Sequence, residues 1–179
     1  CLCVPLMGAD KKLLTKEQSA KKIEAAIRSK LKKPKGELTK ADYEKVTKLL
    51  LFNNRLTDVK GLEKLNKLTE LNLWRNQLTD VKGLEKLTQL TKLWLSDNQL
   101  TNVKGLEKLT KLENLYLSKN QLTNVNGLEK LTWLENLDLR DNPDLTKAQI
   151  DELEKALPKC RIIRIAPQLP ALTPPRESP

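Results

Sequence analysis

The chain is organised around a ten-residue stretch that occurs four times at a constant spacing. It reads LTDVKGLEKL at 56–65 and 78–87, LTNVKGLEKL at 100–109, and LTNVNGLEKL at 122–131. The first leucine of each copy lies 22 residues after the first leucine of the copy before it. Self-similarity at a fixed period of this length predicts a solenoid, in which each copy forms one coil and buries its apolar face against its neighbours.

A second pattern, L-x-x-L-x-L-x-x-N-x-L, links the copies. It occurs as Leu68, Leu71, Leu73, Asn76 and Leu78, and it recurs 22 and 44 residues later. The alternating L-x-L predicts a short strand whose leucines face one side. The whole pattern resembles the signature of leucine-rich repeats. The resemblance implies an α/β repeat solenoid, a leucine-rich repeat horseshoe with a parallel β-sheet on its concave face.

An asparagine follows each predicted strand, and the positions are Asn54, Asn76, Asn98, Asn120 and Asn142. The chain must turn out of the strand there, and a buried side-chain amide can bond the backbone groups that the bend leaves free. We therefore expect these asparagines to form an internal ladder that also bonds the next coil. The Val-x-Gly-Leu-x-x-Leu segment is too short for a full α-helix. It predicts a turn or a short 3₁₀ helix at 61–65 and in each copy.

Residues 15–45 are predicted to form a helical N-terminal cap. Thr15 and Gln18 have the spacing of a capping box, and apolar residues at 20, 23, 27 and 31 predict a helix over 15–33. Its apolar stripe would cover the open end of the leucine column. Thr39 predicts a second, short helix near 40–45. The lysines off the stripe form either a solvated face or a contact with an acidic surface, nucleic acid or anionic lipid; they are Lys16, Lys22, Lys30 and Lys33.

Five repeats are predicted over 46–145, followed by a C-terminal cap over 146–165. The first repeat is degenerate, because Val46 replaces its first leucine. Thr146 predicts the start of a helix in the C-terminal cap. Leu157-x-x-Cys160-x-Ile162 then repeats the strand pattern, which predicts an edge strand with Cys160 at a core leucine position. We interpret this cysteine as a small buried hydrophobe rather than a reactive thiol.

The two ends of the chain are expected to lie outside the solenoid. Residues 1–14 are predicted to be a flexible segment and the proline-rich residues 166–179 a disordered tail. A chain that starts at Cys1 resembles a processed bacterial lipoprotein, in which that cysteine carries the lipid. This interpretation implies lipidation of Cys1 and membrane attachment through it. The alternative is a truncated chain.

The 22-residue unit with its Asp/Asn-Val-x-Gly-Leu return resembles the internalin-type repeats of bacterial surface and secreted proteins. Residues 32–51 and 142–162 resemble the N-terminal caps and the C-terminal endings of such bacterial repeat proteins. The resemblance implies a curved solenoid that binds another protein. It places the chain in the bacterial cell envelope or outside the cell, with a cytoplasmic location as the alternative. We expect a monomer whose protein partner the sequence does not identify.

Catalytic chemistry has little support in the sequence. The chain contains no histidine, which removes Ser-His-Asp and Cys-His sites and the commonest transition-metal ligand. It also lacks a P-loop, a G-x-G-x-x-G motif and a C-x-x-C pair. Most carboxylates stand beside lysines, as in the Glu63–Lys64 copies, and are expected to form surface ion pairs. We predict no catalytic residue, no metal and no cofactor. A hydrolase that uses two carboxylates, such as Asp138 and Asp141, is the remaining enzymatic alternative.

The candidate binding residues lie in rows beside the strand leucines. Four of the six aromatic residues of the chain, Phe52, Trp74, Trp94 and Tyr116, fall in two adjacent rows. Since Trp and Tyr dominate binding hot spots, we predict a recognition stripe with a charged rim. The alternative is that aromatic residues are simply favoured in strands. The predicted partner-binding residues are Phe52, Trp74, Arg75, Lys92, Trp94, Asp97, Tyr116, Lys119, Asp138 and Arg140.

Charge argues against a nucleic-acid partner on this face. The chain has a net charge of +10, but residues 49–145 contain 14 Lys and Arg against 13 Asp and Glu. The acidic residues expected on the binding face would repel phosphates; they are Glu70, Asp97, Glu113, Asp138 and Asp141. The leading hypothesis is a protein-binding module. The second hypothesis is a membrane-anchored structural lipoprotein of the cell envelope with its basic helix near anionic surfaces.

Overall fold

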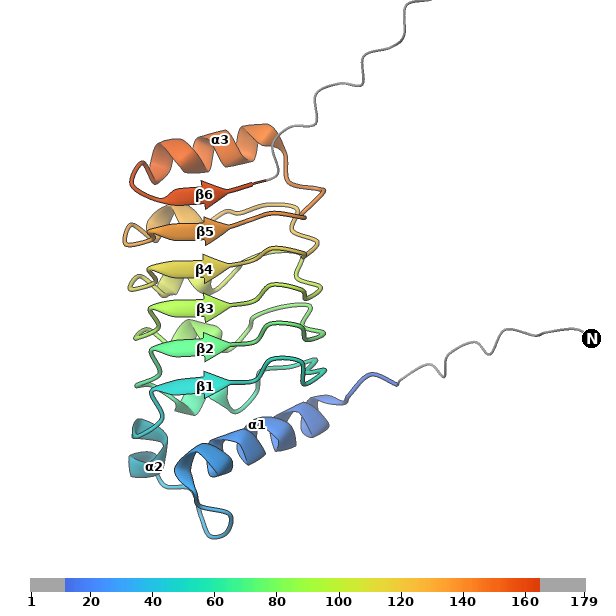
Figure 1. The fold of residues 1–179 in the computed structure, drawn as a ribbon, viewed down its shortest axis with the longest axis vertical. Helices are drawn as coiled ribbons and strands as arrows, with labels where there is room; N and C mark the ends of the chain where they lie inside the picture. The colour runs from blue at the N-terminus through green and yellow to red at the C-terminus, as the bar shows by residue number, and fades with distance from the viewer. Residues whose placement is uncertain (1–11, 165–179) are drawn as a thin grey trace, which may run out of the picture.

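The computed structural model describes residues 12–164, and these residues form a single stack of coils (Figure 1). One strand from each coil joins a parallel six-stranded sheet in chain order, from β1 to β6. The strands are β1 (Lys48–Leu50), β2 (Glu70–Asn72), β3 (Lys92–Trp94), β4 (Asn114–Tyr116), β5 (Asn136–Asp138) and β6 (Arg161–Ile163). The predicted leucine-rich repeat solenoid with a parallel sheet is confirmed.

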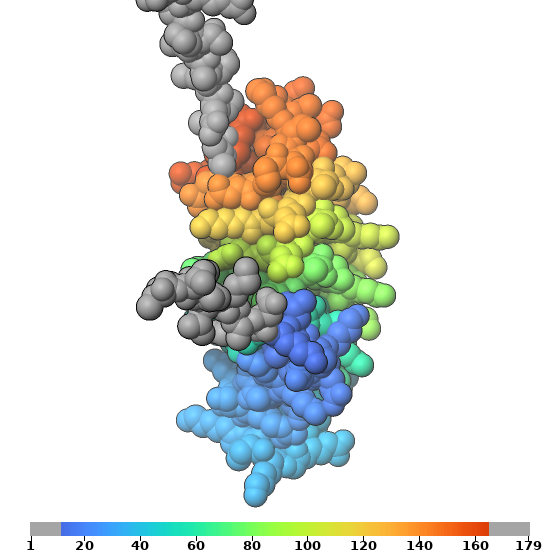
Figure 2. Space-filling model, turned by 90° about the vertical axis from the view of Figure 1, so that its right-hand side faces the viewer, coloured from blue at the N-terminus to red at the C-terminus, as the bar shows by residue number. Residues whose placement is uncertain are grey.

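The sheet occupies one side of the stack, and the return segments run along the opposite side (Figure 1). Four returns contain a short 3₁₀ helix, as predicted; these are η1 (Leu62–Lys64), η2 (Leu84–Lys86), η3 (Leu106–Lys108) and η4 (Leu128–Lys130). In the space-filling view the blue N-terminal cap lies at one end of the long axis, and the coils follow it through green and yellow to orange (Figure 2). We call the outward side of the sheet the concave face and the side of the returns the convex face.

The leucines of the repeat fill the space between these two sides. Leu71, Leu93 and Leu115 occupy the centre of successive strands and are completely buried. The leucines of the 3₁₀ helices are also fully buried, so every coil contributes to one continuous apolar column. Burying one such side chain stabilises the fold by about 1.5–3 kcal/mol, and the aromatic side chains of the concave face are not part of this column.

The asparagine ladder is confirmed for four of its five predicted members. Asn98 donates through Nδ2 to the carbonyl oxygens of Leu73 and Leu95, both at 3.0 Å, and its Oδ1 accepts from the Leu78 amide at 3.1 Å. Asn76, Asn120 and Asn142 repeat this arrangement and are buried. Each amide bonds the coil before it, rather than the coil after it as expected. Asn54 is only half-buried and bonds the carbonyl of Phe52, because no repeat coil precedes it.

Two helices form the N-terminal cap, α1 (Lys16–Leu31) and α2 (Lys40–Glu44). Both predicted capping boxes are present, at Thr15 and Thr39. Ile23 and Ile27 of α1 are buried in the same apolar cluster as the repeat leucines, so the helix covers the end of the column. The predicted helix ends two residues early, because Lys32 adopts the left-handed conformation.

The C-terminal cap consists of α3 (Lys147–Ala156) and β6, as predicted, but the register of β6 is wrong in the prediction. Ile162 pairs with Leu137, whereas the sequence pattern placed Cys160 at that level. Cys160 therefore lies before the strand and is partly buried, packed against the edge of the core. The turn after α3 uses two residues more than the pattern assumed.

Some predictions concern residues that the structure does not describe. Lipidation at Cys1 and the proline-rich tail at 166–179 lie outside the described residues. Residues 12–14, which were assigned to the flexible N-terminal segment, contact the first coil. The Thr57 hydroxyl donates to the carbonyl of Leu14 at 2.9 Å, and Arg55 donates to the carbonyl of Lys12 at 3.0 Å.

Candidate functional site

The strand register arranges the predicted site residues in straight rows on the concave face. The last residue of each strand forms one row. In this row Asn72 lies beside Trp94, and Trp94 lies beside Tyr116. The residue two positions later forms a second row that includes Phe52, Trp74 and Arg140. Backbone bonds from each coil to the next, such as the Asn53 amide to the Trp74 carbonyl at 2.9 Å, align this row. The predicted aromatic residues therefore share one face.

The four aromatic side chains form two pairs with different environments. Trp94 and Tyr116 are half-buried, and their rings stack with centroids 5.6 Å apart and planes 8° from parallel. Phe52 and Trp74 belong to the first two coils and are 48% and 39% exposed. A stacked pair is rigid, and exposed aromatic rings gain most from desolvation by a partner. The face thus combines a fixed centre with an apolar surface open to solvent.

Leu50 extends this apolar surface and was not among the predicted site residues. It lies in the same row as Asn72 and Trp94 and is 65% exposed, more than Phe52 or Trp74. Its position in the row was readable from the sequence. The signal was missed because leucine elsewhere in the repeat is a core residue, and only its place between two buried leucines distinguishes it.

Charged residues border the aromatic side chains, and part of their charge is already balanced. Arg75 donates from Nε to Asp97 at 3.1 Å, and its guanidinium lies 4.9 Å from the centroid of the Trp74 ring. Lys92 and Lys119 make no ion pair with any residue between 12 and 164, and Lys119 is exposed. These two lysines are the charged groups of the predicted site that are open to a partner's carboxylates.

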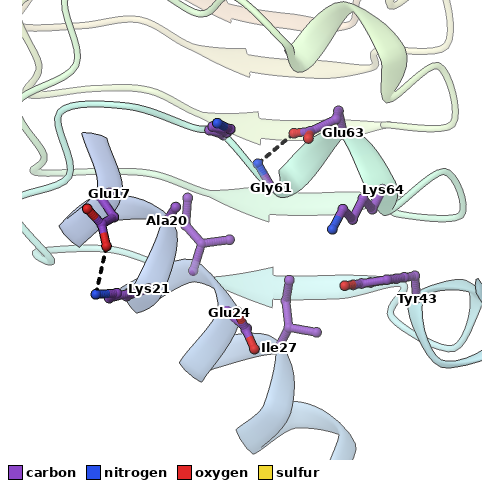
Figure 3. A pocket seen from close by; sticks show the side chains of 11 residues that line it. Glu17, Ala20, Lys21, Glu24, Ile27, Tyr43, Gly61, Glu63 and Lys64 are labelled. Atoms are coloured by element: carbon purple, nitrogen blue, oxygen red, sulfur yellow. Dashed lines mark hydrogen bonds and ion pairs between the residues drawn. The ribbon is translucent and has the colours of Figure 1, made fainter. Parts of the chain in front are cut away.

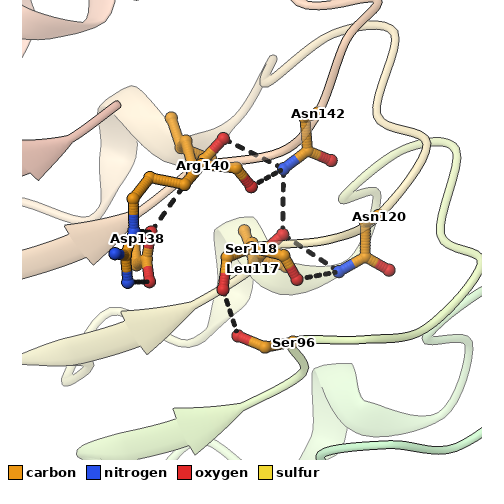
Figure 4. Close-up of polar contacts among 8 residues, drawn as sticks. Ser96, Leu117, Ser118, Asn120, Asp138, Arg140 and Asn142 are labelled. Carbon is orange, nitrogen blue, oxygen red and sulfur yellow. Dashed lines mark hydrogen bonds and ion pairs between the residues drawn. The ribbon is translucent and has the colours of Figure 1, made fainter. Parts of the chain in front are cut away.

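Asp138 is buried, which contradicts its predicted place on the exposed binding surface (Figure 4). Arg140 folds over it: the carboxylate accepts from the Arg140 Nε at 2.9 Å and from its Nη2 at 2.8 Å. Burial alone would raise the pKa of Asp138, but the hydrogen bonds and charge of Arg140 hold that pKa below its usual value. Ser118 and Ser96 bond each other beside this pair at 2.9 Å. Arg140 remains exposed on its outer side.

The convex carboxylates do not form the surface ion pairs that the sequence suggested. Glu63 accepts a hydrogen bond from the Gly61 amide at 2.6 Å, and the other three copies do the same within their own coils. Hydrogen bonds from the backbone amides of Glu107 and Gly105 lower the pKa of Glu107, against the opposing effect of burial. These glutamates therefore act as caps of the 3₁₀ helices.

A cavity of about 270 Å³ lies between α1 and the first return (Figure 3). Its three acidic groups are occupied: Glu17 pairs with Lys21 and Glu24 with Arg28, both at 2.8 Å, and Glu63 accepts a hydrogen bond from the Gly61 amide. The cavity occurs where a straight helix replaces a coil of the stack, so we interpret it as a packing gap.

The described residues offer little for catalysis or metal binding. Within 12–164 there is no group of three or more Cys, Asp or Glu side chains that could hold a metal ion. Burial raises the pKa of the Cys160 thiol to about 11, which keeps it protonated at neutral pH. Asp138, one member of the carboxylate pair considered above, is fully engaged by Arg140.

Known proteins match the repeats and the fold. A family model described as leucine rich repeats (2 copies) matches residues 44–86, 67–108, 88–130 and 110–155. The structure is similar to an internalin from Listeria monocytogenes, with 29% identity, a TM-score of 0.73, and coverage of 78% of this chain and 41% of that chain. It is also similar to a leucine-rich repeat protein from Leptospira interrogans, with 32% identity, a TM-score of 0.64, and coverage of 71% and 34%.

A third similar structure is the functional domain of InlJ from Listeria monocytogenes, with 28% identity, a TM-score of 0.54, and coverage of 67% of this chain and 30% of that chain. No curated protein sequence matches the chain. The chain spans less than half the length of each of these three solved proteins.

Proposed function

Because the chain belongs to the leucine-rich repeat family, whose internalin-type members are typically protein-interaction modules, we propose that its concave face binds a protein partner and that the chain catalyses no reaction. The observation that carries this proposal is the aromatic stripe of Phe52, Trp74, Trp94 and Tyr116. The leucine column is complete without these side chains. An aromatic group that is exposed on a rigid sheet and not needed by the core fits the chemistry of a binding hot spot.

The rim of the stripe favours a folded or extended protein over a nucleic acid. Arg75 and Asp97 neutralise each other, and Glu70 is paired with Lys48 at 2.8 Å. A surface with both signs beside an apolar centre resembles a protein interface, in which polar groups surround the buried part. Phosphates would meet carboxylates on the same side, such as Asp141, which makes no ion pair with residues 12–164. We place the partner across the first four coils, with Lys92 and Lys119 facing its acidic groups.

The proposal is tested by substituting one tryptophan on the concave face and one elsewhere. Trp133 is 66% exposed and lies between η4 and β5, outside the strands, so Trp133→Ala is a control of the same residue type. A partner captured by the wild-type chain should bind Trp94→Ala more weakly by about 2 kcal/mol or more, which is roughly 30-fold in Kd. Trp133→Ala should leave the Kd unchanged.

Thermal unfolding separates a loss of binding from a loss of fold. Removing the Trp94 ring takes away its stack on Tyr116, which contributes about 0.5–1.5 kcal/mol, so Trp94→Ala should melt only a few degrees below wild type. A Trp94→Ala chain that unfolds, or that binds the captured partner as tightly as wild type does, would overturn the proposal.

A further inference from the structure

The N-terminal cap carries a positive charge that its own acidic residues do not balance. Residues 12–45 contain 11 Lys and Arg and 5 Asp and Glu, a formal charge of +6, while residues 46–145 contain 15 and 13, a charge of +2. Four of the five cap carboxylates are held in ion pairs, those of Glu17, Glu24, Asp42 and Glu44. The lysines of the cap without an ion pair in the described part of the chain are Lys12, Lys22, Lys30, Lys32 and Lys35, and all five are exposed.

The loop after α1 holds part of this charge in a fixed arrangement at the end of the molecule (Figure 1). Arg28 donates from Nη1 to the carbonyl oxygens of Lys33 at 3.4 Å and Gly36 at 3.0 Å. Lys33 in turn donates to Asp42 of α2 at 2.7 Å. These bonds hold the loop through the partly buried Arg28 and Lys33 and leave Lys30, Lys32 and Lys35 at the surface, so the backbone that carries the exposed lysines does not need to be ordered on binding.

Lys32 occupies a position at which glycine is ordinarily preferred. Its φ of 53° and ψ of 34° are left-handed, and its amide caps α1 by donating to the carbonyls of Arg28 and Ser29. A side chain at such a position costs stability relative to glycine. Lys32 also borders a shallow hollow of about 390 Å³ that is lined by Ala25, Arg28, Ser29, Lys32 and Pro34. The short side chains of Ala25 and Ser29 thus leave a shallow hollow beside Lys32 on the outside of α1.

An exposed leucine lies at the other end of α1. Leu13 is 60% exposed and stands between Lys12 and Lys16, and the bonds of its neighbours to Arg55 and Thr57 hold it on the surface of the first coil. None of the helices described between 12 and 164 is long and apolar enough to cross a bilayer. An isolated apolar side chain among lysines is suited to insertion at the level of lipid headgroups.

We propose that the N-terminal end of the solenoid docks on a membrane surface of anionic phospholipid, with the five unpaired lysines on the headgroup phosphates and Leu13 in the headgroup–acyl boundary. A bilayer supplies both phosphates for the lysines and an apolar layer for Leu13, whereas a soluble polyanion offers no apolar surface to Leu13. Single-stranded nucleic acid would also need a free aromatic ring. The aromatic residue of this cap is Tyr43, and its ring already has the Lys64 ammonium 5.4 Å from its centroid.

This contact uses a different part of the molecule from the protein-binding face. The cap closes the end of the stack, while the sheet runs along its side (Figure 1). A chain docked through α1 would stand on the membrane with its concave face open to a protein partner. The two interactions can therefore be lost separately by substitution.

The test is co-sedimentation of the full chain with vesicles made of equal parts of phosphatidylglycerol and phosphatidylcholine, and with vesicles of phosphatidylcholine alone. Binding should require phosphatidylglycerol and should disappear at about 1 M NaCl. Combined charge reversal by Lys22→Glu, Lys30→Glu, Lys32→Glu and Lys35→Glu should lower the partition coefficient at least ~100-fold, since each lysine near an anionic surface contributes roughly fivefold.

A matched control has the same change in net charge on the convex face. Lys82, Lys86, Lys104 and Lys108 are exposed and make no ion pair with the described residues, and their reversal to Glu should lower partitioning less than ~10-fold. Equal losses in the two variants would show a response to net charge alone and would overturn the proposal, as would absence of binding to phosphatidylglycerol vesicles.

Two single substitutions distinguish a lipid surface from a folding effect and from a soluble polyanion. Lys32→Gly should raise the melting temperature, because glycine adopts the left-handed conformation freely, and yet lower partitioning about fivefold. Leu13→Ser should lower partitioning about tenfold and leave binding to heparin unchanged. If Leu13→Ser has no effect on vesicles, and heparin binds as strongly as they do, the ligand is a soluble polyanion and the membrane proposal fails.

Discussion

The concave face has a backbone position with positive φ in all five coils and the convex face has one in the first four, and the two faces use different residues there. On the convex face the position is glycine in all four returns, with φ between 99° and 105°. On the concave face it follows the strand and has φ between 53° and 58°; its residues are Asn53, Arg75, Asp97, Lys119 and Asp141. The convex residues hardly vary between copies, whereas the concave residues change in size and in sign of charge.

The difference has a steric basis and a functional consequence. A φ near 100° lies outside the small left-handed region that side chains can enter, so only glycine fits the return. A φ near 55° lies inside that region, where a side chain is tolerated at a cost of about 1 kcal/mol. Glycine would relieve this cost on the concave face, and yet no coil uses it there. Residues that repeat therefore maintain the coil, while residues that vary at a cost in stability are candidates for recognition.

The strongest test of the residues that repeat from coil to coil is to bury a charge in the asparagine ladder. Asn98→Asp should lower the free energy of unfolding by about 3 kcal/mol at neutral pH, because a carboxylate would face the carbonyl oxygens of Leu73 and Leu95. These acceptors favour the protonated acid, so the folded pKa should rise above the unfolded value of about 3.9. The loss should therefore grow as the pH rises above about 4, which urea titrations at several pH values would measure.

Asn98→Leu provides the companion measurement. It leaves backbone groups without partners but adds no charge, so it should cost about 1–3 kcal/mol with no dependence on pH. Two variants as stable as wild type would mean that the ladder does not hold adjacent coils together.

A side chain in the convex glycine row should have the next largest effect. Gly127→Ala should destabilise the chain by about 1–2 kcal/mol, because its φ is 99° and the new Cβ would lie 3.1 Å from the Cβ of Glu107. Thermal unfolding monitored by circular dichroism would measure this change. An unchanged melting temperature would remove the steric distinction between the two faces.

The converse substitution on the concave face should stabilise the fold. Lys119→Gly relieves a φ of 55° and should raise the free energy of unfolding by up to about 1 kcal/mol, less the entropy that glycine adds to the unfolded chain. The same variant should bind the protein partner more weakly, because the Lys119 ammonium makes no ion pair with residues 12–164 and is open to a partner's carboxylate. Loss of stability together with unchanged affinity would assign Lys119 to the scaffold.

The smallest expected effect concerns the convex carboxylates. The pKa of Glu107 is lowered from its ordinary value of 4.5, so the charged form stabilises the fold above that pH and the contribution is lost as the pH falls through the folded pKa. Glu107→Gln should remove this part of the acid sensitivity and cost less than about 1 kcal/mol at neutral pH. Identical pH profiles for the two chains would show that the bond to Gly105 contributes nothing measurable.

Sequence periodicity predicted those features that recur in several copies. The strand register of β1 to β5, the 3₁₀ returns and the buried asparagines each appear at the 22-residue step, so one interpretation applied to all coils. The capping boxes were predictable because their chemistry is local. The β6 register failed because residues 157–163 occur once, and the length of the turn after α3 has no second copy to compare.

The sequence predicted which residues of the candidate site share a row on the concave face, but not which of their side chains are exposed to solvent. Alternation along a strand assigns Asp138 and Trp94 to the same face, and the structure agrees. Whether a side chain in a row is open to solvent depends on its neighbours: Arg140 covers Asp138, while Leu50 is 65% exposed. Such contacts follow from side-chain conformations and not from spacing, which is why the buried carboxylate was misassigned and the exposed leucine was overlooked.

The parallel stacking of the coils also determines how the chain responds to mechanical force. The strand and asparagine hydrogen bonds join one coil to the next, and the two caps close opposite ends of the stack (Figure 1). Tension applied between the caps would load these bonds one interface at a time and peel the coils away in turn, rather than shear several strands at once. The solenoid would extend at low force in steps of one repeat. It would therefore act as a compliant tether between molecules attached to its two caps.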